Sequence, residues 1–292
     1  MRTRIAVIGP GAVGGAVAAW LDQSADNEVI LCARTTLDRL VVETPSRRIE
    51  AHPPVLTEPA EAHTVDWVLV ATKTYDAAAT RRWLAPLVGP ATRVAVLQNG
   101  VEHVARFAQF ASPERIVPAV VDIPAERSAP GRVRQRRMGT IVVPQGENGR
   151  AFIDLFADTP ITVSTTEDFT TAAWKKLALN CAGAVSALTL KPAGISWRED
   201  IAEIQRAMVR ECVAVGHAEG AKLDPDLPEE VIAHYRDGPK DSVNSLHADR
   251  VAGRPLELDA RNGVIVRLAA KHGIAAPINA MVVALIEAAT ND

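Results

Sequence analysis

The sequence of 292 residues is poor in cysteine, in aromatic side chains and in long apolar runs. Its three cysteines, Cys32, Cys181 and Cys212, form no CxxC pair, which excludes a dense disulfide framework and is typical of a reducing compartment. No apolar run approaches the roughly 18 residues that a membrane-spanning helix needs. The net charge of −3 excludes a general attraction to nucleic acid or to an anionic membrane. We therefore expect a cytoplasmic protein with neither nucleic-acid nor membrane partners, and we predict no metal site.

Length and composition are those of a globular protein with two domains. Hydrophobic residues make up 48% of the chain and charged residues 23%, which is ordinary for a folded protein. A chain of 292 residues is longer than one simple hydrophobic core usually supports. The first apolar segment begins at Ile5, so we expect no signal peptide before the fold.

The first part of the chain alternates between strand and helix patterns. Short apolar runs, typical of strands buried on both faces, are followed by segments with helical spacing. This alternation predicts a parallel sheet with crossover helices. The predicted strands are 4–9, 27–34, 65–73 and 92–100, and the predicted helices are 12–24, 74–89 and 101–110.

The pattern changes after residue 115. Segments 115–124, 132–144 and 160–168 are predicted strands without long helices between them, and we expect them to extend the sheet, partly antiparallel. From residue 168 the apolar spacing is helical to the end of the chain, with Gly220 and Gly273 as predicted helix C-caps. The predicted fold class is α/β, with a Rossmann-type dinucleotide-binding domain at 1–167 and an all-helical domain at 168–292. The predicted helices of the second domain are 170–189, 200–220, 228–238 and 257–273.

A glycine-rich loop follows the first predicted strand. Gly9, Gly11 and Gly14 satisfy the pattern GxGxxG between an apolar strand and an apolar helix. In this context Gly9 allows a tight turn, Gly11 lets a pyrophosphate approach the backbone, and Gly14 lets the helix pack on the strand. A tight turn without a ligand is the alternative. The predicted cradle consists of Gly9, Pro10, Gly11, Ala12, Val13 and Gly14.

The end of the second predicted strand indicates which dinucleotide binds. NAD-binding proteins usually carry an acidic residue there, about 20 residues beyond the loop, to hold the ribose hydroxyls. This chain has Arg34 at that place. A guanidinium can bind a 2′-phosphate with two hydrogen bonds, so Arg34 favours NADPH. The alternative is an ordinary surface arginine.

A lysine and an amide in the predicted helix 170–189 are candidates for the site. Lys176 and Asn180 are four residues apart and share one helix face, which Ala184 continues. Lys175 points elsewhere. Their apolar neighbours indicate the wall of a cleft, whereas spacing alone favours an ordinary solvated lysine at position 176.

Four further positions are candidates for the site. Lys73 and Asn99 follow the carboxyl ends of two predicted strands, where ligands of open α/β sheets bind. Ser245 precedes a predicted helix and could be a simple N-cap. Glu257 follows Pro255 in the predicted first turn of a helix, where a carboxylate is favourable in any case.

A basic cluster lies in the segment 132–137. The first three of its arginines would share one face of a strand. We predict an exposed basic face on an edge strand, which would also guard against pairing with another strand. A second anion site for an acidic substrate is the alternative. The arginines are Arg132, Arg134, Arg136 and Arg137.

Together these motifs resemble the ketopantoate reductase family (2-dehydropantoate 2-reductases). The resemblance covers nearly the whole chain and follows ordered motifs: GPGAVGG, CAR, the lysine of TKTYD, LQNGV, WKKLALNC, NSLHADRVAGRPLELDARNG and HGIAAPIN. It implies a Rossmann domain followed by a helical domain, with the active site in the cleft. It also implies transfer of a hydride from NADPH to the 2-keto carbon of ketopantoate, which gives pantoate on the route to pantothenate.

The resemblance implies a role for each candidate residue. Lys176 matches the family's catalytic lysine, which donates a proton, and Glu257 matches the acidic residue that works with it. Asn180 matches a substrate-side asparagine, and Ser245 matches the serine that binds the substrate carboxylate. Asn99 matches the asparagine between cofactor and substrate. Arg34 and Lys73 match cofactor contacts.

The chain departs from the family pattern at Ala184, where the family commonly has a second asparagine. This change leaves three hypotheses: ketopantoate reductase itself, a related reductase of another 2-keto or 2-imino acid, or an NADP-binding sensor without turnover. The substrate we expect is a small 2-keto acid. A homodimer would be compatible with the apolar helix faces of the second domain, although the sequence does not require one.

Overall fold

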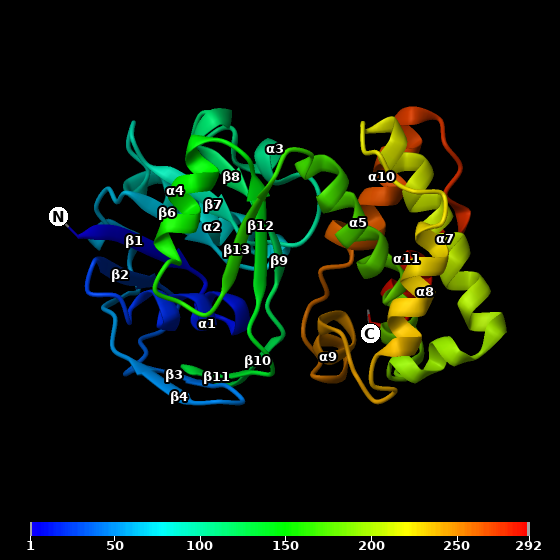
Figure 1. Cartoon of the computed structure of the whole chain (residues 1–292), viewed down its shortest axis with the longest axis horizontal. Coiled ribbons are helices and arrows are strands. Elements are labelled where there is room, and N and C mark those ends of the chain that lie inside the picture. Colours follow the sequence, from blue (N-terminus) through cyan, green and yellow to red (C-terminus); the bar gives the residue numbers. More distant parts are fainter. Residues whose placement is uncertain (1, 291–292) are drawn as a thin grey trace. The chain divides into compact units, whose positions relative to one another are not determined.

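The structure is a computed structural model that describes residues 2–290. Its backbone contacts divide the chain into two compact units (Figure 1). The first unit contains Met1–Gln98 and Glu102–Phe169, and the second contains Asn99–Val101 and Thr170–Asp292. The sequence patterns change at 167/168, whereas the contacts change at 169/170. In addition, the short segment Asn99–Val101 contacts the helical unit, although it follows a strand of the first.

A parallel sheet forms the centre of the first unit. Its six strands, counted within residues 2–290, have the order β5-β2-β1-β6-β7-β8, and every neighbouring pair is parallel. The strands are β1 (Thr3–Ile8), β2 (Asn27–Cys32), β5 (Val55–Leu56), β6 (Trp67–Val70), β7 (Arg93–Val96) and β8 (Ile116–Pro118), and the accompanying helices are α1 (Ala12–Leu21), α2 (Ala77–Leu87) and α3 (His103–Phe107). The predicted α/β fold class is confirmed.

A second sheet covers the side of α1 that faces away from the parallel sheet (Figure 1). It has the order β10-β11-β3-β4 and is formed by β3 (Leu40–Glu43), β4 (Arg48–Ala51), β10 (Ala125–Ala129) and β11 (Arg132–Gln135). Helix α1 is therefore buried continuously from Gly14 to Leu21, which explains why its sequence is apolar on all sides. The Trp20 indole, for example, donates a hydrogen bond to the Gln135 side chain at 2.9 Å.

The prediction that segments 115–168 extend one sheet is wrong except for β8. The strands β9 (Val120–Asp122), β12 (Thr140–Pro144) and β13 (Thr162–Thr166) form a third sheet, in which β12 pairs antiparallel with β9 and parallel with β13. Helix α4 (Glu147–Leu155) supplies the crossover between the two parallel strands. A crossover helix of nine residues is long enough to return the chain in the same direction.

The arginine cluster is exposed as predicted, but its strand is not an edge strand. Strand β11 lies between β10 and β3, so both of its edges are paired. Arg136 and Arg137 lie beyond the end of β11, and they form ion pairs with Glu126 at 2.7 Å and with Asp122 at 2.6 Å. The strands β3 and β4, within residues 40–51, were not predicted from the sequence. Strand β3 pairs with the edge of β11 that was expected to be free.

The second unit is helical. No strand occurs between residues 170 and 290, which confirms the predicted all-helical character of this part. Its helices are α5 (Phe169–Ala182), α6 (Ala184–Thr189), η4 (Ala193–Trp197), α7 (Glu199–Ala218), α8 (Leu227–Asp237), α9 (Ser245–Val251), the π-helix η5 (Asp259–Gly263), α10 (Val264–His272) and α11 (Pro277–Ala288). Gly273 is the left-handed C-cap of α10, and Gly220 follows the end of α7 with φ of +89°.

The predicted single helix over 170–189 is broken at Gly183. Helix α5 ends at Ala182 and α6 begins at Ala184. A Cβ atom on Gly183 would lie 2.6 Å from the Tyr235 hydroxyl oxygen, so only glycine fits at this crossing. Ala184 is fully buried in the helical core, whereas Lys176 and Asn180 are half-buried.

The helices of residues 2–290 include none long and apolar enough to cross a membrane. All three cysteines are free and buried. Burial raises the pKa of the Cys32 thiol to about 12, which keeps this side chain protonated at neutral pH.

Candidate functional site

The glycine loop between β1 and α1 is shaped by the chain's own atoms at two of its three glycines. Gly9 has a φ of +85°, and a Cβ atom there would lie 2.8 Å from the Thr72 methyl group. At Gly14 a Cβ atom would lie 2.3 Å from the carbonyl oxygen of Gly9. Gly11 is different, because a Cβ atom built there meets no atom of the described chain within 4 Å. The chain itself does not need glycine at position 11, so the open space beside it fits a ligand that approaches the backbone.

The start of α1 offers unpaired backbone donors to such a ligand. Gly11 is the N-cap and has no side chain, and the first helical hydrogen bond runs from the Gly15 amide to its carbonyl at 2.9 Å. The amides of Ala12 and Val13 therefore have no partner within the helix, while Pro10 before them has no donor to offer. A phosphate fits this arrangement, since it accepts these hydrogen bonds and complements the positive end of the helix dipole.

Neighbouring strand ends add two side chains to this edge of the sheet. Arg34 follows β2 and is exposed, and Lys73 follows β6 as the N-cap residue of the short 3-10 helix η2 (Thr74–Asp76). Because β2, β1 and β6 are adjacent and parallel, both follow the same edge as the loop. The cofactor candidates of the first unit thus share one edge of one sheet, where Rossmann folds bind dinucleotides.

Hydrogen bonds among Thr72, Gln98 and His103 stabilise the backbone beside the glycine loop. The Gln98 amide donates to the Thr72 carbonyl at 3.0 Å, and Thr72 is the residue that faces Gly9. The His103 ring contacts the Gln98 carbonyl oxygen at 2.8 Å. Burial lowers the pKa of His103 to about 4, so its imidazole is neutral at pH 7.

In the helical unit, Asn99 and Glu257 lie together. The Asn99 amide nitrogen donates to a Glu257 carboxylate oxygen at 3.2 Å, and Glu257 is only 5% exposed. The prediction that Glu257 occupies the first turn of a helix is wrong, because η5 begins at Asp259. Glu257 lies in the irregular segment that precedes η5.

Asn180 and Ser245 are brought together by an arginine that the sequence analysis missed. The Nη2 atom of Arg261 lies 3.3 Å from the Asn180 amide oxygen and 3.3 Å from the Ser245 hydroxyl oxygen. Arg261 belongs to η5, and π-helical turns occur often at functional sites. The signal in the sequence was an arginine four residues after Glu257.

The other reading of Ser245, as an N-cap, is also wrong. Asn244 caps α9, because its side-chain oxygen accepts a hydrogen bond from the His247 amide at 3.0 Å. Ser245 is the first residue of the helix, and its hydroxyl is directed to Arg261.

Lys176 lies one turn before Asn180 on α5. Its side chain is half-buried, whereas the neighbouring Lys175 is exposed and Trp174 is buried. The predicted difference between the two lysines is therefore observed. Lys176 and Asn180 share a helix face, which places both on the side of α5 that carries the polar groups.

Side chains from other helices hold the end of α5, where backbone carbonyls lack helical partners. The Tyr235 hydroxyl donates to the Leu179 carbonyl at 2.8 Å, and the Asn244 amide donates to the Gly183 carbonyl at 2.8 Å. The Asn262 amide donates to the Cys181 carbonyl at 3.2 Å. These bonds fix the backbone around Asn180, so its side chain is held by structure far away in the sequence.

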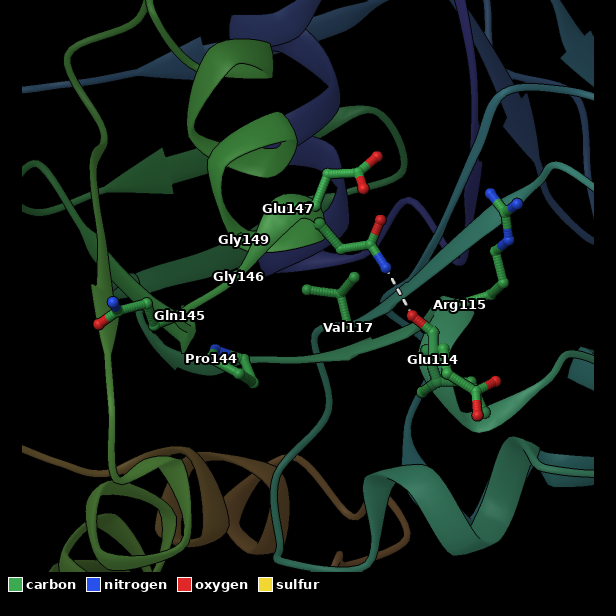
Figure 2. Close-up of a pocket in the computed structure, with 10 residues that line it drawn as sticks. Glu114, Arg115, Val117, Pro144, Gln145, Gly146, Glu147 and Gly149 are labelled. Carbon is green, nitrogen blue, oxygen red and sulfur yellow. Dashed lines mark hydrogen bonds between the residues drawn. The ribbon is translucent and has the colours of Figure 1, made fainter.

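A hollow of about 370 Å³ in the first unit lies away from the predicted site residues. Figure 2 shows it between the strand residues near Val117 and the start of α4 at Glu147. Its lining residues, at 114–117 and 144–149, include no predicted site residue. The Asn148 amide in its wall is engaged with the Glu114 carbonyl at 2.5 Å. In residues 2–290 no group of three or more His, Cys, Asp or Glu side chains could hold a metal ion.

Family models match both units. The model described as "Ketopantoate reductase PanE/ApbA" matches residues 5–148, and the model for the C terminal part of the same reductase matches residues 168–290. These two matches together cover most of the chain.

Individual proteins agree with the family models. A relative from Caulobacter vibrioides, named 2-dehydropantoate 2-reductase, is 65% identical over 287 residues, which cover 98% of this chain and 99% of the relative. The crystal structure of a PanE/ApbA family ketopantoate reductase from Ralstonia eutropha JMP134 has a TM-score of 0.91 and 31% identity, with 99% of each chain covered. A structure described as a dimeric ketopantoate reductase from Staphylococcus aureus has a TM-score of 0.88 at 24% identity, with 98% of each chain covered.

Proposed function

The chain belongs to the ketopantoate reductase family, and from this premise we propose that it reduces 2-dehydropantoate (ketopantoate) to pantoate with NADPH. Membership in this family makes the chain an oxidoreductase with a nicotinamide cofactor. The observation that carries the proposal for the substrate is the cluster of Asn99, Asn180, Ser245 and Glu257 in the helical unit.

The residues proposed to hold NADPH lie along one edge of the parallel sheet. The backbone of Gly9–Gly14 holds the pyrophosphate, with the open side of Gly11 as its point of closest approach. The exposed Arg34 takes the 2′-phosphate, which favours NADPH over NADH. Lys73 and Asn99 are the proposed further contacts.

The reduction needs a hydride and a proton, and a bound nicotinamide dinucleotide supplies the hydride. When the hydride reaches the 2-keto carbon, the carbonyl oxygen gains the negative charge of an alkoxide. The proposed role of Lys176 is to donate a hydrogen bond to that oxygen beforehand and a proton to it afterwards. A preorganised donor of this kind typically raises the rate by roughly 10²–10³.

Glu257 is proposed to act with this lysine. A buried carboxylate favours a protonated ammonium group nearby, which keeps the proton donor charged between turnovers. The hydrogen bond from Asn99 orients the carboxylate. Asn180 and Ser245 are the proposed contacts to the polar end of the substrate, and Arg261 already links the two.

The three cysteines and the exposed apolar residues bear on where and how the protein works. Free, buried cysteines fit the proposed cytoplasmic location.

Large exposed apolar side chains of the described residues concentrate on the helical unit and would suit a homodimer. They are Leu190, Trp197, Ile204, Val243, Val251, Met281 and Leu285.

The proposal is tested by following NADPH oxidation with a panel of 2-keto acids that includes ketopantoate, together with 2-imino acids. We expect ketopantoate to give the highest kcat/KM. A far higher value for another acid would identify the related reductase, for which the methyl of Ala184 in place of an amide is the motivating feature. Tight NADPH binding without turnover of any compound would instead indicate a sensor.

A further inference from the structure

Arg261 carries a buried positive charge that is only partly satisfied. It is 4% exposed, and its hydrogen bonds to Asn180 and Ser245 both come from Nη2. The Nε and Nη1 atoms are buried and have no hydrogen-bond partner among residues 2–290. Guanidinium groups offer five N–H donors in a planar fork, so most of the capacity of this side chain is unused.

Such an arrangement is costly unless a further partner arrives. Buried polar groups are usually hydrogen-bonded, and a buried charge without a close counter-ion is more expensive still. Burial accordingly lowers the pKa of Arg261, while the Glu257 carboxylate acts in the opposite direction. The Glu257 and Asp249 carboxylates both favour the charged guanidinium, but their hydrogen bonds come from other side chains: Glu257 accepts from Asn99 at 3.2 Å, and Asp249 accepts from Arg254 at 2.8 Å.

The position of Arg261 is fixed by its neighbours in η5. Asn262 is fully buried, and its amide donates to the Cys181 carbonyl at 3.2 Å and to the Asn279 side chain at 2.9 Å. These bonds tie η5 both to the end of α5 and to α11. The guanidinium is therefore held beside Asn180 and Ser245 before any ligand binds, which is the arrangement that electrostatic recognition requires.

We propose that Arg261 is a specificity-determining residue that recognises the carboxylate of the 2-keto acid substrate. The inference rests on the proposed function, in which Asn180 and Ser245 contact the polar end of the substrate. A carboxylate bound at these two residues can accept a charge-assisted hydrogen bond from Nη1 of Arg261, and a bidentate pair forms where it also takes over a hydrogen of Nη2 from Asn180 or Ser245. The substrate class is thereby narrowed to anionic 2-keto acids, and neutral carbonyl compounds of the same size are disfavoured.

A purely structural role for Arg261 makes a different prediction. If the guanidinium only braces Asn180 and Ser245, its removal harms every substrate equally. If it recognises the carboxylate, its removal harms the acid alone. The ratio of kcat/KM for ketopantoate to kcat/KM for its primary amide separates the two roles, because the amide keeps the shape and lacks the charge.

The test compares Arg261→Met and Arg261→Lys with the unchanged protein. For Arg261→Met we expect kcat/KM for the acid to fall by roughly 10- to 150-fold, mainly through KM, since one charge-assisted contact is lost. The value for the amide should change by less than about threefold, well within the range of one lost neutral hydrogen bond. Arg261→Lys keeps the charge without the fork, so it should retain a reduced preference for the acid.

The matched control is Arg250→Met. Arg250 also holds backbone, because its guanidinium donates to the carbonyls of Ala187 and Leu188, and neither of these is a proposed substrate residue. We expect this variant to lose stability and to keep the ratio of acid to amide. An equal loss for acid and amide in Arg261→Met, or an unchanged ratio, would overturn the proposal.

Failure of the proposed function is distinguishable from failure of this inference. If the unchanged protein prefers another 2-keto acid, that acid and its amide replace the first pair. If it reduces no 2-keto acid, the proposed function fails, and calorimetric binding of pantoate against pantoamide still tests Arg261. If Arg261→Met does not fold, Arg261→Lys decides: a ratio equal to that of the unchanged protein contradicts the inference.

Discussion

The glycine loop and the cluster around Arg261 are built in opposite ways. The loop occupies six consecutive positions, Gly9–Gly14, and depends on atoms that are absent, because a Cβ at Gly9 or Gly14 would collide with the chain. The cluster draws Asn99, Asn180, Ser245, Glu257 and Arg261 from distant segments. The cluster depends on side-chain atoms that are present, and contacts with other elements hold these side chains in place. Added atoms should therefore damage the loop, and removed atoms should damage the cluster.

The largest expected effect comes from the helical unit, at Lys176. Lys176→Ala removes the proposed proton donor, and we expect kcat to fall by roughly 10²–10³ while NADPH still binds. The exposed neighbour gives a matched control, because Lys175→Ala should keep kcat. Steady-state kinetics and NADPH fluorescence titration measure the two quantities. Near-normal kcat in Lys176→Ala would remove the lysine from the mechanism.

The next largest effect is the pH dependence of stability that His103 contributes. Burial lowers the pKa of His103 from an ordinary 6.5 to about 4, so protons bind less readily to the folded than to the unfolded protein. The stability contributed by this neutral imidazole is fully present above about pH 6.5 and is lost as the pH falls toward 4. The shift corresponds to about 3 kcal/mol.

The measurement is the free energy of unfolding in urea between pH 7 and pH 4, for the unchanged protein and for His103→Gln. Since a glutamine side chain does not titrate, the difference between the two curves should shrink as the pH falls. Parallel curves over the whole range would show that His103 does not carry this pH dependence.

Two glycines of the loop should respond differently to substitution by alanine. Gly14→Ala places a methyl group 2.3 Å from the Gly9 carbonyl oxygen, and we expect a loss of about 1–3 kcal/mol in the free energy of unfolding. Gly11→Ala meets open space, so its stability should change by less than about 0.5 kcal/mol. Its KM for NADPH should nevertheless rise about tenfold, if the open space belongs to the cofactor. Equal stability losses in both variants would mean that Gly11 serves the fold.

The smallest expected effect is at Arg34, which is exposed and partly screened by solvent. In Arg34→Ala the ratio of kcat/KM for NADPH to kcat/KM for NADH should fall by about tenfold. The control is Arg39→Ala, since Arg39 forms an ion pair with Glu50 at 2.7 Å and lies outside the proposed site. An equal fall of this ratio in both variants would mean that the loss of one positive charge causes it, and not the position of Arg34.

Local patterns were sufficient to predict the α/β class, the loop and the helical half. The loop is recognisable because strand, turn and helix are contiguous, and Gly9, Gly11 and Gly14 each have a local function. The second sheet was missed because its strands β3 and β4 have four residues each and no helix between them. The all-round apolar sequence of α1 was the available sign that something covers its outer face.

The cluster could be predicted only in part. Resemblance to the family supplied roles for Asn99, Asn180, Ser245 and Glu257, whereas position alone left an ordinary role at a helix start open for Ser245 and Glu257. Arg261 was missed because its position depends on a π-helical turn and on the break at Gly183, and neither has a strong local signature. The bonds from Tyr235 and Asn244 that hold this region join residues more than fifty positions apart, as their separations of 56 and 61 show.

The central claim is that the chain transfers hydride from NADPH to an anionic 2-keto acid, and one assay tests it most directly. Purified protein is mixed with NADPH and ketopantoate, loss of NADPH fluorescence is followed, and the product is identified by mass spectrometry. The account predicts one pantoate formed for each NADPH consumed, and roughly 10²–10³ lower turnover with Lys176→Ala. Consumption of NADPH without pantoate, or no consumption with any 2-keto acid, would contradict it.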